Sequence, residues 1–349
     1  MKRSTRPTQH DIARAAGVST AVVSLVVNGR ADGKVKISGA TQERVRQAIR
    51  DLGYVPNLAA RQLAGGVTHT IGIFTYDPIF PMQPSSFYQP FLVGIEEQAA
   101  VSDYNLLLFT RGTYPRKIYR DGVNELLATQ GAILLGTNED RTELARLRDD
   151  GFPFVFVGRR EIEGRSIPCT AAAYADASAH LVDRLLDAGH RRILYVGIPD
   201  GNESAADRES GFLMSMASAG IPHPESLVQR LDPGLIDAAW LRHHREAGIT
   251  AFALEQTFVA THILSITRTI GLAVPHDLSL VALGKADDPM QDPQDIDTFF
   301  IPHREMGAEA VRLLDRMLTD PATDTSQPIT IPCQPAPGHT IGPPVSTTT

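Results

Sequence analysis

The feature that most constrains the fold is an alternation that begins at residue 70, where short apolar runs are followed in turn by longer amphipathic stretches. The short runs predict β-strands, and apolar positions spaced by three or four residues predict helices between them. Strands that alternate with helices imply parallel sheets with right-handed crossovers, and about 260 residues of this pattern fit two doubly wound lobes better than one. The predicted strands span residues 70–76, 106–109, 132–135, 154–157, 192–196, 251–254 and 278–283, and the predicted helices span residues 91–100, 177–188, 208–219 and 259–270.

Two facing lobes of this kind form a cleft, because doubly wound sheets bind ligands at the carboxyl ends of their strands. The chain has 349 residues and is 42% hydrophobic, which is enough to bury more than one core. Residues 335–349 are rich in Pro and Thr and are predicted to form a flexible tail. The fold class is therefore α/β for residues 70–334.

The residues before this body predict three short helices and a fourth shorter one, each beginning at a side chain that can cap a helix. The caps are Thr8, Ser19, Ser38 and Asn57. The expected ends are Gly17, Asn28 with Gly29, Gly53 and Ala64. The residues expected to face inward are Ile12, Ala15, Ala16, Val22, Val23, Val26, Val27, Val45, Ala48, Ile49 and Leu52.

Charge separates this small head from the rest of the chain. Residues 1–65 contain eleven Lys and Arg against four acids, a balance of +7, whereas the whole chain carries −7. The remainder therefore carries −14. A basic head on an acidic body is typical of a module that binds a polyanion, since attraction to phosphates needs only local charge.

The two first helices, joined by Gly17 and Val18 alone, predict a helix-turn-helix, whose second helix enters the major groove of DNA. Its outward residues Thr20, Ala21, Ser24 and Leu25 are expected to meet base edges, with apolar contacts to thymine methyl groups from Ala21 and Leu25. Phosphate contacts are expected from Ser19, Asn28 and Thr41, with added charge from Arg30, Lys34, Lys36 and Arg44.

Three runs in the head, TQHDIARAAGVSTAVVSLVVN at residues 8–28, TQERV at 41–45 and LGYVPNLAARQL at 52–63, resemble the LacI/GalR family of bacterial transcription regulators. The resemblance implies that residues 57–64 form a hinge helix that folds on the operator, and that Leu63 is a wedge between base pairs in the minor groove; the alternative for Leu63 is an apolar anchor of the linker. Relatives commonly carry an arginine where this chain has Leu25. The DNA-contacting set is predicted to be Thr8, Ser19, Thr20, Ala21, Ser24, Leu25, Asn28, Thr41, Asn57, Ala60 and Leu63.

The resemblance continues over residues 70–340 in GIEE at 94–97, LLDAGHRRI at 185–193, RESGF at 208–212, TAF at 250–252, VPHDLS at 274–279 and EMG at 305–307. It implies a body like the periplasmic sugar-binding proteins, with an effector in the cleft. Arg208 aligns with an arginine that many relatives use to hold a ligand; the alternative is a surface salt bridge. The predicted effector set is Asp77, Ser85, Phe87, Arg159, Arg208, Gln256 and Thr257.

Departures from the family leave the effector open. Where relatives often carry Asn-Asp this chain has Gln256 and Thr257, and where they often carry Gly-Phe-Asp it has Ala282, Leu283 and Gly284. The cleft is therefore expected to lack the carboxylates that a sugar site uses, so a sugar and a less hydroxylated, acidic ligand both remain open.

Other classes are not favoured. The chain has no dinucleotide, Walker or nucleophile-elbow motif, so no enzyme is predicted, and its two cysteines, Cys169 and Cys333, predict neither a disulfide framework nor a metal site. No cofactor or metal is expected. No signal peptide or run of eighteen apolar residues is found, so a cytoplasmic protein without membrane contact is expected rather than a transport binding protein.

The predicted organisation is a DNA-binding head (1–56), a hinge (57–69), a two-lobed effector and dimerisation domain (70–334) and a tail (335–349). The protein is expected to act as a homodimeric repressor on duplex DNA, with a tetramer as the alternative.

Overall fold

The computed structural model describes residues 7–27, 36–54, 69–79, 87–199, 201–286, 295–320 and 322–345. The chain divides into two compact units, one formed by residues 1–70 with the segment Ala128–Gln130 and one by the remainder. We call the described residues 7–27 and 36–54 the head, and those from 71 onward the body. No single helix in the described part is long and apolar enough to cross a membrane; the first two helices of the head would meet that test only as a pair bent by 106°.

The head contains three helices that begin as the sequence predicts, and the first and third also end as predicted. The predicted end of the second, at Asn28 and Gly29, lies outside the described residues. Thr8 and Asp11 cap the first helix reciprocally: the Thr8 hydroxyl accepts from the Asp11 backbone N–H, and the Asp11 carboxylate accepts from the Thr8 backbone N–H at 2.9 Å. Gly17 and Gly53 end the first and third helices in the left-handed conformation, at φ 65° and 61°. The helices are α1 (Gln9–Ala16), α2 (Thr20–Val27) and α3 (Gly39–Leu52).

The core of the head differs from the prediction at two positions. Ala15 is exposed, because α1 packs through the neighbouring face that holds Ile12, Ala13 and Ala16. Leu52 is 40% exposed, because it is the last residue of α3, beyond the part of that helix that packs inward. The other buried apolar residues are Val23, Val45 and Ala48, and the half-buried ones are Val22, Val26, Val27 and Ile49.

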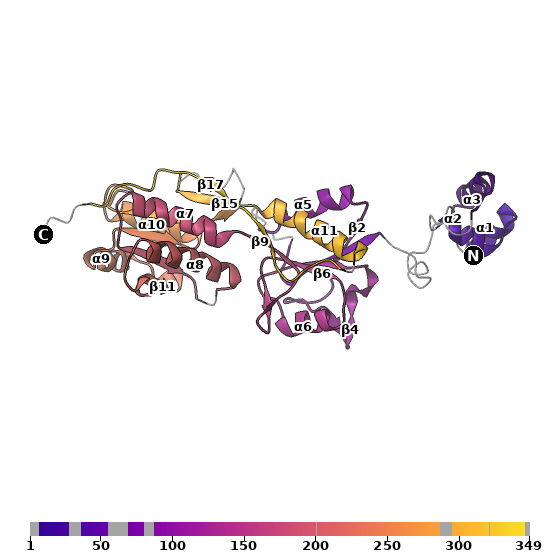
Figure 1. Ribbon diagram of the computed structural model, residues 1–349, viewed down its shortest axis with the longest axis horizontal. Coiled ribbons are helices and arrows are strands. Elements are labelled where there is room, and N and C mark those ends of the chain that lie inside the picture. Colours follow the sequence, from indigo (N-terminus) through magenta and orange to yellow (C-terminus); the bar gives the residue numbers. More distant parts are fainter. Residues whose placement is uncertain are drawn as a thin grey trace. The chain divides into compact units, whose positions relative to one another are not determined.

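The body contains the two predicted parallel sheets (Figure 1). In the first sheet, alternate residues of β5 point into different apolar clusters: Ile133 and Leu135 into one, Ala132 and Leu134 into the other. Both faces are therefore covered, as a doubly wound sheet requires. The strand order is β16 (Ile329–Ile331), β9 (Cys169–Ala172), β6 (Phe154–Val157), β5 (Ala132–Leu135), β1 (Thr70–Thr75) and β2 (Asn105–Phe109), and the helices of this lobe are α5 (Gln89–Val101), α6 (Arg141–Asp149) and α11 (His303–Thr319).

The second sheet is parallel throughout and is likewise covered on both faces, because Phe252 and Leu254 of β12 pack into a different cluster from Ala251 and Ala253. Its order is β11 (Val228–Arg230), β10 (Ile193–Gly197), β12 (Ala251–Leu254) and β13 (Ser279–Ala282). Its helices are α7 (Tyr174–Asp187), α8 (Glu203–Ser218), α9 (Ala238–Glu246) and α10 (Thr257–Thr269).

The chain passes from the first lobe to the second after β9, returns between β15 and α11, and leaves again between β16 and β17. All seven predicted strands and all four predicted body helices are confirmed, with small shifts at their ends. The short strands β9, β15, β16 and β17 and the long helix α11 were not predicted. The remaining elements are β14 (Lys285–Ala286), β15 (Thr298–Ile301), β17 (Gln334–Ala336), the hairpins β3 (Tyr119–Arg120) with β4 (Val123–Asn124) and β7 (Glu161–Ile162) with β8 (Arg165–Ser166), and 3-10 turns at Glu125–Ala128, Pro224–Leu227 and Pro233–Leu235.

The predicted flexible tail is wrong for residues 335–345. Strand β17 pairs antiparallel with β15, and the Asp297 carboxylate accepts hydrogen bonds from the backbone N–H groups of Gly338 and Thr340, at 3.0 and 2.9 Å. The carbonyl oxygen of Gly342 lies 2.8 Å from the ring of the buried His190. Composition suggested disorder, but these distant polar partners fix the segment. Residues 346–349 lie outside the described residues.

Two glycines of the sequence signatures allow α5 and α11 to touch. A Cβ on Gly94 would lie 1.8 Å from the carbonyl oxygen of Arg304, and a Cβ on Gly307 would lie 2.2 Å from that of Phe91. Both contacts are with backbone atoms of the facing helix, which cannot rotate away. These glycines therefore serve packing rather than ligand binding.

We predict that Gly94→Ala lowers the stability of the body by about 2 kcal/mol or more, because the two helices must separate to admit the methyl group. Denaturant unfolding followed by the tryptophan signal of the body would measure this. Gly39→Ala is the control, since no atom lies within 4 Å of a Cβ there. Equal unfolding midpoints for Gly94→Ala and the unchanged protein would show that the contact is relaxed at no cost.

Candidate functional site

The start of α2 presents the predicted DNA-contacting side chains of the head. Ser19, Thr20 and Ala21 are exposed, while Ser24 and Leu25 are half-buried. The Ser19 hydroxyl accepts from the Val22 backbone N–H at 3.3 Å, and so caps the helix. Its own proton remains able to point outward to a phosphate.

The other predicted DNA contacts are Thr8, at the start of α1, and Thr41, in the first turn of α3, whose hydroxyl lies 2.9 Å from that of Ser38. Helix N-termini favour anions, which suits both positions for phosphate. Asn28, Asn57, Ala60 and Leu63 lie outside the described residues, as do Arg30 and Lys34, so their roles stay predictions.

The exposed arginines of α3 differ in their partners. Arg50 pairs with Glu43 at 2.6 Å, and Arg46 lies 3.8 Å from the same carboxylate. Arg44 has no acidic partner within 4.0 Å in the described part of the chain. Its charge is the one on this helix that no neighbouring acid offsets, which favours a contact with a phosphate.

In the body, a cavity of about 600 Å³ is walled by residues of both lobes, among them Thr137 and Asn138 after β5 and Glu255 and Gln256 after β12. Of the predicted effector residues, Phe87, Arg208, Gln256 and Thr257 line it, and Ser85 lies outside the described residues. The size is within the range of small-molecule sites. The lining residues that the sequence did not predict include Thr137, Asn138, Tyr174, Glu255, Lys285 and His303.

Arg208 is buried and is held by the protein on two sides. Its Nε donates to the Leu283 carbonyl at 2.6 Å and its Nη1 donates to the Ser204 carbonyl at 2.9 Å. The guanidinium also lies over the Tyr174 ring, 3.8 Å from its centre. At 5% exposure the residue is not part of a surface salt bridge, so that alternative is wrong.

Asp77 does not line the cavity; it positions residues that do. Its carboxylate accepts from the Thr137 backbone N–H at 2.7 Å and from the Asn138 amide at 2.9 Å. Partial burial opposes ionisation, but hydrogen bonds from Thr137, Asn138 and Tyr88 outweigh it and hold the pKa of Asp77 below its usual value. The prediction that Asp77 lines the cleft is therefore wrong, because its acceptor capacity is used by the protein.

Arg159 is also absent from the cavity wall, since Asp207 of α8 binds its guanidinium at 2.6 and 3.1 Å. The next residue, Arg160, is 5% exposed and pairs with Glu139 at 2.9 Å and with Glu203 at 3.8 Å. Arg159 and Arg160 follow β6 of the first lobe, whereas Glu203 and Asp207 belong to the second. Together with Glu139, these residues form an ionic network between the lobes.

We predict that Arg160→Met destabilises the body by about 3 kcal/mol, because Glu139 and Glu203 lose their buried cation and keep only the more exposed Arg141, at 3.5 and 2.9 Å. Arg159→Met is the matched control; its partners are more exposed, so a loss of about 1 kcal/mol or less is expected. Denaturant unfolding of both variants measures the difference. Equal losses would mean that burial does not decide the strength of this network.

Glu255, directly after β12, corrects the expectation that the cavity lacks carboxylates. It is 3% exposed and accepts from the Gln256 amide at 3.1 Å and from the Tyr195 hydroxyl at 3.3 Å. His303, the first residue of α11, is 1% exposed and packs on the ring of Phe91 at 4.3 Å. Burial, with the charge of Arg208, lowers the pKa of His303 to about 4, so the ring is neutral near pH 7.

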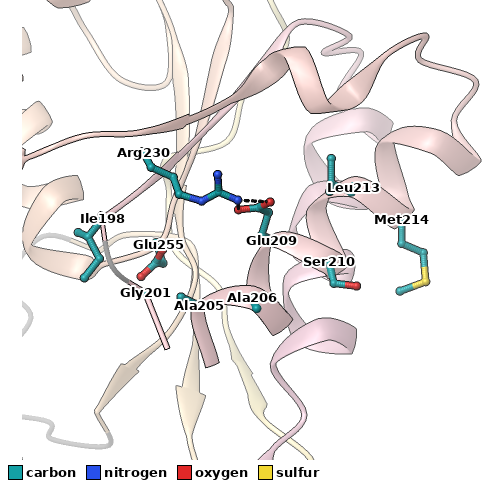
Figure 2. Close-up of a pocket in the computed structure, with 10 residues that line it drawn as sticks. All are labelled: Ile198, Gly201, Ala205, Ala206, Glu209, Ser210, Leu213, Met214, Arg230 and Glu255. Carbon is teal, nitrogen blue, oxygen red and sulfur yellow. Dashed lines mark hydrogen bonds and ion pairs between the residues drawn. The ribbon is translucent and has the colours of Figure 1, made fainter. Parts of the chain in front are cut away.

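A second cavity of about 590 Å³ lies beside α8 (Figure 2). Glu209 of α8 and Arg230 of β11 form an ion pair in its wall, and Ile198, Gly201, Ala205 and Glu255 line both cavities. Glu255 therefore stands where the two cavities adjoin. Among the described residues, no group of three or more His, Cys, Asp or Glu side chains could hold a metal ion.

Comparisons with known proteins match both parts of the chain. Residues 8–57 match the family "Bacterial regulatory proteins, lacI family", and residues 182–341 match the family "Periplasmic binding protein-like domain". The transcriptional regulator CelR of Thermobifida fusca is 27% identical over 336 residues, covering 93% of this chain and 95% of CelR. Catabolite control protein A of Priestia megaterium is 28% identical over 327 residues, covering 91% and 95% of the two chains.

Solved structures show the same fold. The lac repressor dimer bound to operator and the anti-inducer ONPF matches with a TM-score of 0.72 at 23% identity, covering 97% of this chain and all of that one. A CelR complex with cellobiose matches with a TM-score of 0.63 at 23% identity, covering 96% of this chain and 100% of that one. A helix-turn-helix head joined to a two-lobed periplasmic-binding-protein-like body defines a DNA-binding transcriptional regulator. The chain thus carries a head of the lacI family of bacterial regulatory proteins, joined to a periplasmic-binding-protein-like domain.

Proposed function

We propose that the protein is a repressor that binds an operator duplex as a homodimer and whose affinity for that operator is set by a small effector in the cavity between the lobes. The observation that carries this proposal is that one cavity is walled by residues of both lobes. A ligand that touches both walls favours one arrangement of the lobes over others, and that difference is what a regulator needs. The operator complex of the lac repressor dimer supports the assembly.

We infer a sugar as the effector. Support comes from the cellobiose complex of CelR and from a cavity that mixes aromatic rings with hydroxyl, amide and charged groups. We further infer that the protein acts in the cytoplasm, where it has access to DNA, and that it regulates rather than catalyses, as the names of its relatives indicate. The predicted contacts of Asn28, Asn57, Ala60 and Leu63 with DNA belong to the same proposal.

The test uses the full chain and fluorescein-labelled fragments of the DNA upstream of its own gene. Fluorescence anisotropy at moderate salt is expected to show one fragment bound at least a thousandfold more tightly than random duplex of equal length. Addition of cellobiose and of a panel of common mono- and disaccharides should change that affinity. No preference for any fragment would contradict the proposal.

We predict that Arg44→Gln weakens operator binding severalfold and lowers the salt slope by about one ion, because one uncompensated phosphate contact is lost. Arg50→Gln is the matched control on the same helix. Glu43 already offsets the Arg50 charge, so its loss should change affinity and slope less. If the two variants have equal slopes, ion pairing within α3 does not select the phosphate contact.

We also predict that Arg208→Gln abolishes the rise in melting temperature that the most effective sugar of the panel gives the unchanged protein. That rise reflects binding to the folded state, worth about 2.7 kcal/mol at a hundredfold excess over Kd. Differential scanning fluorimetry measures it, and operator binding without sugar should persist. An undiminished rise would remove Arg208 from the site.

A further inference from the structure

The cavity between the lobes contains two buried side chains whose hydrogen-bonding capacity the protein leaves partly unused. Glu255 is a carboxylate at 3% exposure, and its two bonds come from neutral donors, the Gln256 amide and the Tyr195 hydroxyl. No Lys, Arg or His nitrogen of the described residues lies within 4.0 Å of it. A buried carboxylate without a cation is costly unless further donors reach it.

His303 is the second such group. Neither ring nitrogen has a hydrogen-bond partner among the described residues, although the ring is 1% exposed. Its faces are well packed, with Phe91 at 4.3 Å and Phe87 at 5.3 Å between ring centres. Packing therefore explains an aromatic ring at this position but not the two nitrogens. A neutral imidazole offers one donor and one acceptor, which a hydroxyl group can meet in either sense.

Two cations, Arg208 and Lys285, also line the cavity, and both contact protein groups. Arg208 already donates to two backbone carbonyls and lies over Tyr174. The Lys285 ammonium lies over the ring of Phe300, 4.8 Å from its centre. Arg208 has no acidic partner within 4.0 Å among the described residues, and neither does Glu255 have a basic one. These two opposite charges in one wall offset each other, so a ligand without a negative charge leaves their balance unchanged. This distribution favours a ligand that donates hydrogen bonds over one that brings a carboxylate.

The two groups come from different lobes. Glu255 follows β12 of the second sheet, and His303 begins α11, which packs on the first sheet. A ligand that bonds both joins the lobes. We propose that Glu255 and His303 are the residues that select the effector: they require an uncharged or amine-bearing ligand with adjacent hydroxyl groups that bridges the lobes, and they reject carboxylate ligands. This inference rests on the effector cavity proposed above.

The test compares three variants of the full chain: Glu255→Gln, His303→Phe and, as a control, Glu209→Gln. Glu209 is a carboxylate in the adjoining cavity that is already paired with Arg230, and it does not line the cavity between the lobes. The probes are glucose, galactose, mannose, cellobiose, maltose and lactose, the amino sugars glucosamine and galactosamine, and the uronates glucuronate and galacturonate. Melting temperature and isothermal calorimetry measure binding.

We expect a neutral or an amino sugar to bind best and the uronates to bind at least tenfold more weakly. Glu255→Gln should lower the affinity for a neutral sugar about tenfold and that for an amino sugar about a hundredfold, because an ammonium group loses a charged partner. The difference distinguishes hydroxyl donors from an ammonium donor. His303→Phe should lower the affinity for the best probe about tenfold, and Glu209→Gln should change that affinity by less than twofold.

A second measurement needs no ligand. His303→Phe keeps the ring contacts and removes two unmet polar atoms, so the free protein should melt at the same or a higher temperature while its affinity falls. A lower melting temperature would indicate that the nitrogens have a structural role and would overturn the inference. So would a uronate as the best probe, or unchanged affinity in both cavity variants.

The outcome of Arg208→Gln separates this inference from the proposed function. If the best probe binds the unchanged protein and Arg208→Gln abolishes that binding, the cavity holds the effector, and unchanged affinity in the Glu255 and His303 variants refutes only the selection. If all four variants bind that probe equally, the effector site is elsewhere and both proposals fall. No response to any probe contradicts both the sugar effector and the selection.

Discussion

The direction of the strands is the constraint on which the site depends. In a parallel sheet all carboxyl ends lie at one edge, so residues far apart in the chain meet there once the sheets form. Thr137 and Asn138 follow β5, Tyr174 follows β9, and Glu255 follows β12. Part of the chemistry of the cavity is thus set by the first three residues after each strand, while Arg208 and His303 come from α8 and α11. The strands themselves are apolar and indifferent to the ligand, which allows one fold to serve many effectors.

The same rule explains how much of the site the sequence could predict. Gln256 and Thr257 line the cavity as expected, because β12 has its predicted bounds. Arg208 lines it too, although α8 begins at Glu203, five residues before the predicted start, because the family resemblance rather than the helix bounds indicated this residue. Asp77 and Arg159 also follow strands but do not reach the cavity. The end of a strand indicates the edge of the sheet on which a residue lies, but not which residue it will bind. Asp77 and Arg159 bind Asn138 and Asp207, which become their neighbours only in the folded chain.

The parts of the fold that depend on local signals were predicted well, and those that depend on distant partners were not. The caps Thr8 and Ser38 and the stop at Gly53 involve bonds within a few residues, so composition and spacing reveal them. The tail is held by Asp297 and His190, which lie far away in sequence. His303 was missed because α11 was not predicted, although Met306, Ala310 and Leu314 recur at helical spacing. A ring without a hydrogen-bond partner can, moreover, be recognised only in the folded protein.

The two kinds of polar group between the lobes have opposite energetic roles. Arg160 pairs with Glu139 and Glu203, and this attraction between residues of the two lobes favours their present approach, whether or not a ligand is bound. His303, whose ring nitrogens have no partner among the described residues, and Glu255, a carboxylate bonded only by neutral donors, are each costly to bury, by about 1 to 3 kcal/mol. A ligand that satisfies both would remove a cost of this order from one arrangement of the lobes and from no other. Coupling between sites in allosteric proteins is typically about 1 to 3 kcal/mol, so two such residues suffice to link effector binding to a change in the grip on DNA.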